Sequence, residues 1–101
     1  MELKELHHLA FKEMGVDPNL LNKIESRTDN IIIKYARAIF CRVARESGYK
    51  SGEIADYINR DFGIVNKDIR DLRDIEWQKD FISTAIIEGY YRVLNLVKNN
   101  G

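Results

Sequence analysis

The sequence predicts an all-α domain of about six helices. Apolar residues recur with the 3.6-residue period of amphipathic helices along most of the chain, and no stretch has the convincing alternation of a β-strand. Capping residues stand where helices would begin, and glycines stand where several would end. With 101 residues, of which 45% are hydrophobic and 32% charged, the chain fits a single globular domain over residues 1–101.

Local signals define the first two helices. An apolar stripe predicts a helix over residues 2–14, which Gly15 terminates. Asp17 is expected to cap a short second helix with Pro18 at its first position, because the carboxylate accepts free backbone N–H groups and proline already has a helical φ. The apolar residues of that second helix would be Leu20, Leu21 and Ile24.

The third helix is predicted to be the central one, running from a capping cluster at residues 28–30 to Gly48. Residues 31–33 are three consecutive isoleucines, which a β-strand would also favour. The cap before them and the helical period after them favour a helix. Its apolar stripe follows i, i+4, i+7, i+11 spacing at Ile32, Ala36, Ile39 and Val43.

Three further helices complete the prediction. Ser51 is a natural cap for a helix ending near Ile58, and Asn66 is a candidate cap for a helix over residues 65–75. The longest helix, over residues 77–98, would close over the rest. A long helix, a short helix, a glycine-containing turn and a second short helix follow the order of a helix-turn-helix unit, although the same order also occurs in plain packing corners.

Several classes of site are not expected. Cys41 is the only cysteine, so no intrachain disulfide can form, and its apolar surroundings predict a buried, unreactive thiol. The glycines fit neither nucleotide-binding fingerprint, which argues against a nucleotide-hydrolysing enzyme. His7 and His8 are adjacent and lie about 100° apart on a helix, so no metal site and no cofactor are predicted. A charged N-terminus and the lack of a long apolar run predict a cytoplasmic protein without a membrane segment.

The net charge of zero hides an uneven distribution. Residues 23–50 hold seven basic and three acidic residues, whereas residues 51–80 hold five basic and eight acidic ones. A cationic central helix is what a phosphate-tracking surface needs, although a solvated face with i, i+4 ion pairs has the same composition. Within residues 65–75, basic residues three apart are each followed by an aspartate, as Lys67-Asp68, Arg70-Asp71 and Arg73-Asp74. This alternation suits an ion-paired surface helix at least as well as one that enters a groove.

Short motifs follow one another in a fixed order through the chain. Val16 to Leu21 leads to Ser26-Arg27, and then come residues 33–38 (IKYARA), 43–46 (VARE), 51–55 (SGEIA) and 79–81 (KDF). In this order and spacing the chain resembles the C-terminal DNA-binding domain of the bacterial replication initiator DnaA. The resemblance implies a trp-repressor-like helix-turn-helix domain that binds DNA without catalysis, in replication or transcription control.

The chain departs from that family at the residues that read bases. Asp29 stands where the family has the arginine of its basic loop, and residues 63–69 (GIVNKDI) stand in place of its recognition signature. Only the glycine and the final apolar position of that signature are kept. Recognition of the initiator's own target sequence is therefore not implied.

We expect double-stranded DNA as the partner, with two groups of contacts. Phosphate contacts are expected from Arg27, Lys34, Arg37, Lys50 and Ser51. Base contacts are expected from Asn66, Lys67 and Arg70, because asparagine pairs with adenine and arginine with guanine in the major groove.

The alternative is a protein-interaction module that has kept the fold and lost the DNA contacts. In that case the alternating charges of residues 67–74 would serve a protein partner. Tyr91, with Leu94 and Lys98 on the same helix, is a candidate surface for a homo-oligomer.

Overall fold

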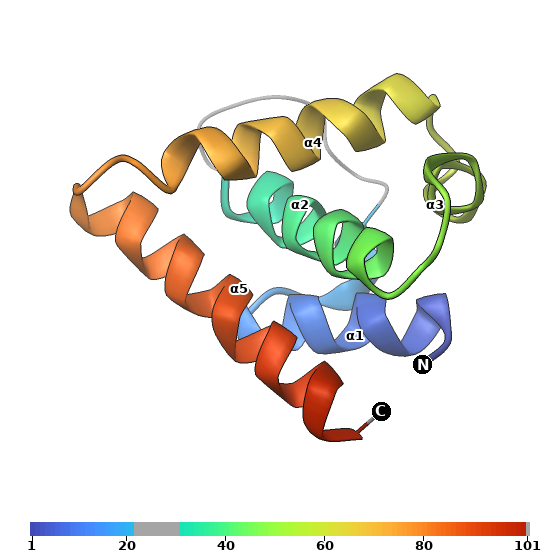
Figure 1. The fold of residues 1–101 in the computed structure, drawn as a ribbon, viewed down its shortest axis with the longest axis horizontal. Coiled ribbons are helices and arrows are strands. Elements are labelled where there is room, and N and C mark those ends of the chain that lie inside the picture. Colours follow the sequence, from blue (N-terminus) through green and yellow to red (C-terminus); the bar gives the residue numbers. More distant parts are fainter. Residues whose placement is uncertain (22–30, 101) are drawn as a thin grey trace.

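The computed structural model describes residues 1–21 and 31–100, and this part of the chain is all-α, as predicted. Five α-helices and one short 3₁₀ helix are present in it (Figure 1). In chain order the elements are α1 (Leu3–Glu13), the 3₁₀ helix η1 (Pro18–Leu20), α2 (Ile31–Glu46), α3 (Ser51–Ile58), α4 (Phe62–Ile75) and α5 (Phe81–Asn100).

Helix α2 forms the centre of the fold. Residues 36–41 are all buried, and since each residue turns the helix by about 100°, this run is covered on every side. Helices α1, α4 and α5 pack around it (Figure 1). Ile31 and Ile32 are 44% and 37% exposed, so the buried part of the helix begins after them and not at Ile32.

The N-terminal segment follows the predicted local signals. Helix α1 matches the predicted first helix to within a residue, and Gly15 follows it with a positive φ of 69°. The Asp17 carboxylate accepts a hydrogen bond from the backbone N–H of Asn19 at 2.9 Å, with Pro18 at the first helical position. Up to Leu21, where the described segment ends, this helix is a single 3₁₀ turn. Ile24 and the capping cluster at residues 28–30 lie outside the described residues.

The later helices begin at other residues than predicted. Helix α3 has Lys50 as its N-cap, whose backbone N–H donates to the Glu53 carboxylate at 2.9 Å, and Ser51 is its first helical residue. Helix α4 begins at Phe62, so Asn66 lies inside the helix and does not cap it. Gly63 had indicated a turn before the helix. In the structure it lies in the first turn of α4.

The connections around α4 also depend on single residues. Asn59 ends α3 in the left-handed region, with a φ of 57°, which asparagine tolerates better than most side chains. Helix α5 begins at Phe81 rather than Trp77, because the Asp80 carboxylate accepts the backbone N–H of Ser83 at 2.9 Å. Residues 76–80 therefore connect α4 to α5.

Helix α5 closes the fold, as predicted, and runs from the end of α4 across α1 (Figure 1). Its buried side chains include Ile86, Tyr90 and Val93. A Cβ atom at Gly89 would lie 2.8 Å from the Met14 sulfur, so the glycine permits the close approach of α1 and α5.

Candidate nucleic-acid interface

A buried ion pair joins α2 to α4. The Arg37 guanidinium donates two hydrogen bonds to the Asp68 carboxylate, Nε–Oδ2 at 2.5 Å and Nη2–Oδ1 at 3.1 Å. The two residues are 7% and 1% exposed. Burial raises the pKa of the Asp68 carboxyl, and the bonds from Arg37 oppose that rise. The prediction that Arg37 contacts phosphate is therefore wrong for this fold, because the guanidinium faces Asp68 in the interior.

Two more cations of α2 are paired with acids, one within α4 and one just beyond its end. The Lys34 ammonium lies 2.9 Å from the Asp71 carboxylate, and Arg42 donates to Glu76. The Arg42 guanidinium also lies over the Tyr90 ring of α5, 4.3 Å from its centroid. Much of the positive charge that the sequence places on the central helix is thus neutralised within the fold.

Ser51 links the start of α3 to α2 and to α4. Its hydroxyl accepts a hydrogen bond from Arg45 Nη1 at 2.8 Å and donates one to Asn66 Oδ1 at 2.9 Å. Because Ser51 is only 8% exposed and its hydroxyl is already engaged, the prediction of a phosphate contact at Ser51 is not supported by its placement. Its role is to hold Arg45 and Asn66 in place, while the amide nitrogen of Asn66 remains available as a donor.

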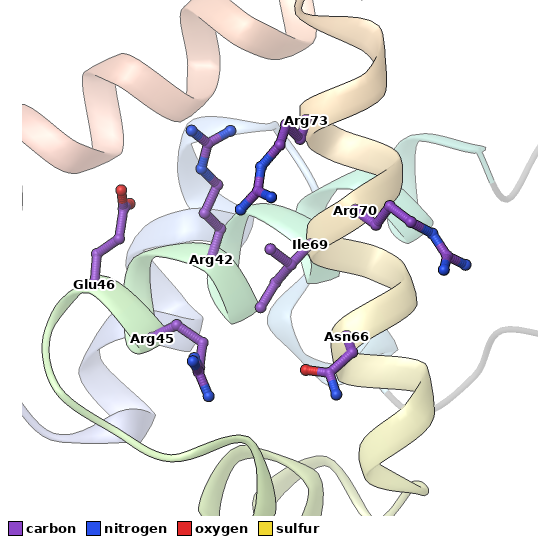
Figure 2. A pocket seen from close by; sticks show the side chains of 7 residues that line it. All are labelled: Arg42, Arg45, Glu46, Asn66, Ile69, Arg70 and Arg73. Atoms are coloured by element: carbon purple, nitrogen blue, oxygen red, sulfur yellow. The ribbon is translucent and has the colours of Figure 1, made fainter.

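A cationic cleft opens between the C-terminal half of α2 and helix α4. Its volume is about 430 Å³, and Ile69 supplies an apolar wall. Figure 2 shows Arg42 and Arg73 extending into the same space from opposite sides, with Arg45 facing Asn66 below them. The side chains that line the cleft are Arg42, Arg45, Glu46, Asn66, Ile69, Arg70 and Arg73.

The charge of this cationic cleft is strongly positive. Four arginines line it, against one acid, Glu46, whose carboxylate accepts a hydrogen bond from the Tyr90 hydroxyl at 2.5 Å. Within residues 1–21 and 31–100, neither Arg70 nor Arg73 has an ion-pair partner, and both are exposed. Guanidinium groups in this state are suited to phosphate oxygens, which they bind in a bidentate fashion.

The structure brings together only some of the predicted site residues. Asn66 and Arg70 line the cationic cleft, whereas Lys67 is exposed on α4 outside it. Lys50 is exposed at the N-cap of α3, and Arg27 lies outside the described residues. Sequence reasoning did not place Arg42, Arg45 and Arg73 in the site. The signal that could have identified them is i, i+3 spacing, between Arg42 and Arg45 on α2 and between Arg70 and Arg73 on α4.

The single cysteine of the chain is unreactive. Cys41 is fully buried in α2, as predicted, and burial raises the pKa of its thiol.

In the described part of the chain, no helix combines the length and the apolar character that crossing a membrane requires. Comparisons of the chain with protein-family models, with curated proteins and with solved structures gave no match.

Proposed function

We propose that the protein is a non-catalytic helix-turn-helix DNA-binding protein of the cytoplasm, acting in replication or transcription control. In this proposal α3 and α4 form the motif, and α4 lies in the major groove of double-stranded DNA. Three residues, 59–61, separate the two helices, which is the connection length of such motifs.

The sorting of charges around α4 is the observation that carries the proposal. Asp68 and Asp71 face α2, where Arg37 and Lys34 neutralise them. The cations that follow the same period, Lys67, Arg70 and Arg73, are exposed. Two of the three aspartates of α4 are thus paired inward, and only Asp74 is exposed beside the three cations. This sorting leaves the solvent-facing side of the helix net positive, which suits a phosphate-lined groove.

Phosphate contacts are assigned in this proposal to Arg45, Arg73 and Lys50, and base contacts to Asn66 and Arg70. Arg45 and Arg73 stand in the cationic cleft beside α4, where a DNA strand bordering the groove would pass. Among the described residues, Asn66 retains an unused amide donor and a second acceptor lone pair for adenine, and Arg70 has no ion-pair partner and can contact guanine.

Binding of a fluorescein-labelled duplex, followed by anisotropy at two salt concentrations, tests the proposal. The wild-type protein should bind at low salt and lose affinity as salt increases, because binding releases counterions. The variant Arg70→Ala plus Arg73→Ala should bind much more weakly. A matched control, Lys4→Ala plus Lys12→Ala, removes the same charge from exposed positions on α1, on the opposite side of α2. No binding at low salt, or equal binding by the two double variants, would exclude the proposal.

A protein-interaction module is the second candidate. It is favoured by a group of exposed apolar side chains where α4 meets α5, Trp77 (82% exposed), Phe81 (88%) and Ile82 (53%). Light scattering over a range of protein concentrations would detect self-association through this group. A dimer that Phe81→Ala plus Ile82→Ala dissociates, in a protein that binds no DNA, would favour this candidate.

A further inference from the structure

Aromatic side chains are exposed at both ends of α4. Phe62, the first residue of the helix, is 61% exposed, and Trp77, just beyond its end, is 82% exposed. Among the described residues, neither ring contacts another aromatic ring. Large aromatic side chains left with open faces in water are typical of contact surfaces.

These two aromatic residues belong to one stripe along α4. At 100° per residue, positions 62, 66, 70, 73 and 77 fall within an arc of about 80°. Glu76 has helical φ and ψ angles of −59° and −28°, so the turn of the helix continues up to Trp77. We call these five residues the α4 stripe: Phe62, Asn66, Arg70, Arg73 and Trp77. At 1.5 Å per residue the stripe is about 22 Å long.

The charge in the middle of the α4 stripe is complementary to an anionic partner. Arg70 and Arg73 have no ion-pair partner in the described part of the chain, and both border the cationic cleft. The acid nearest to Trp77 along the chain, Glu76, is occupied by Arg42. An apolar protein surface would desolvate these guanidinium groups without compensation, whereas a polyanion would pair with them.

A single nucleic-acid strand matches both features of the α4 stripe. It carries a phosphate at every nucleotide, and its bases have open faces that stack on aromatic side chains. In a duplex those faces are covered by neighbouring base pairs. We propose that the α4 stripe binds single-stranded nucleic acid, with phosphates in the cationic cleft and a base stacked on Trp77. This inference rests on the proposed nucleic-acid function and extends it to unpaired strands.

Trp77 is the only tryptophan of the chain, so its fluorescence reports on this position alone. A thymidine oligonucleotide of about ten nucleotides should bind and quench the fluorescence, since stacking brings the base onto the indole. An oligomer of the same length with abasic sugars should bind without quenching. Variants at position 77 lack this tryptophan, so their affinities are measured by the anisotropy of a fluorescein-labelled thymidine oligonucleotide. Trp77→Ala should weaken binding by about tenfold, the effect of losing one base–aromatic stack. Trp77→Phe, which keeps a stacking ring, should largely retain affinity.

Tyr91→Ala provides the matched control, because Tyr91 is an aromatic residue of α5 outside the α4 stripe and is 49% exposed. It should bind the thymidine oligonucleotide as the wild type does. If duplex DNA binds but the thymidine oligonucleotide does not quench Trp77, or if Trp77→Ala binds it as tightly as Trp77→Phe, the inference fails and the proposed function stands. If neither duplex nor single strand binds, both fail. A blue shift of Trp77 that grows with protein concentration, without any response to the oligonucleotide, would overturn the inference in favour of self-association.

Discussion

His7 joins three elements through one imidazole ring. Its Nε2 lies 2.8 Å from the carbonyl oxygen of Pro18, and its Nδ1 lies 2.9 Å from the hydroxyl of Tyr57 in α3. A carbonyl can only accept, so Nε2 carries the proton and Nδ1 accepts from the tyrosine. The ring is 8% exposed, and it packs edge-on against Phe11 and Phe40. His7, which the sequence excluded as a metal ligand, therefore has a structural role in linking these elements.

The burial of His7 predicts a pH-dependent stability. Burial lowers the pKa of His7 below the ordinary 6.5, although the bond to Pro18 opposes this. The unfolded chain therefore binds this proton more readily, so the free energy of unfolding should decrease as the pH falls through about 6.5 and below. Urea unfolding at pH 7.5 and pH 5.0 measures the difference. His7→Phe should reduce it strongly, whereas His8→Gln, at an exposed neighbour whose charge only adds to the effect of burial, should reduce it much less. An equal pH dependence in both variants would contradict the prediction.

At the scale of elements, the packing of α4 on α2 decides which of its charges face inward. Asp68 shares the inner side of α4 with the buried residues Val65, Leu72 and Ile75. A carboxylate in this position needs a partner, and Arg37 supplies it from the buried middle of α2. The two side chains are thus part of the core, although the alternating charges around Asp68 are typical of an exposed helix.

Removing one partner of this ion pair should cost more than removing both. Asp68→Asn leaves the Arg37 charge buried without compensation, so we expect a loss of about 3–5 kcal/mol in the free energy of unfolding. The double variant Arg37→Met plus Asp68→Leu should lose less, because no buried charge remains. Urea denaturation measures both values. As a control, Asp74→Asn changes an exposed carboxylate of the same helix and should stay within about 0.5 kcal/mol of the wild type. Similar losses for Asp68→Asn and Asp74→Asn would rule out a buried pair.

At the scale of the whole molecule, a net charge of zero coexists with a cationic surface. Three cations of α2 are paired with acids in or just beyond α4, while the exposed Arg45, Arg70 and Arg73 line the cationic cleft. One of these pairs, between Arg42 and Glu76, lies at the cleft itself. It is only partly buried, so it limits the positive charge that the cleft presents without being part of the core.

Releasing Arg42 should strengthen binding to DNA. Glu76→Gln removes the acid that holds Arg42, so the affinity for duplex DNA at low salt should increase several-fold. The slope of log K against log salt should become more negative by up to about 0.9, the contribution of one further phosphate contact. Anisotropy titrations at several salt concentrations measure both quantities. Glu88→Gln makes the same change of charge at an exposed position on α5 and should have little effect. Equal affinities and slopes for the two variants would contradict the prediction.

The sequence alone determined the all-α class, the central position of α2, the closing role of α5 and the buried state of Cys41. These depend on apolar periodicity, which is local and survives in any packing of the helices. The sequence was less informative about the residues at which the helices begin. Gly63 and Asn66 resemble turn and capping residues, yet Asp61 is the N-cap of α4 and Phe62 is its first residue.

Only the tertiary structure decided which charges are free. Arg37 stands in an apolar run of α2 and Arg70 stands next to Asp71 in α4, but neither context tells whether the guanidinium has a partner on another helix. The crossing of α2 and α4 places Arg37 against Asp68 in the interior and leaves Arg70 exposed beside the cationic cleft. Ion pairs between helices depend on the distance between side chains that are about 30 residues apart, as in Arg37 and Asp68. A periodic pattern within one helix carries no information about that distance, so the composition of the cleft emerges only from the folded chain.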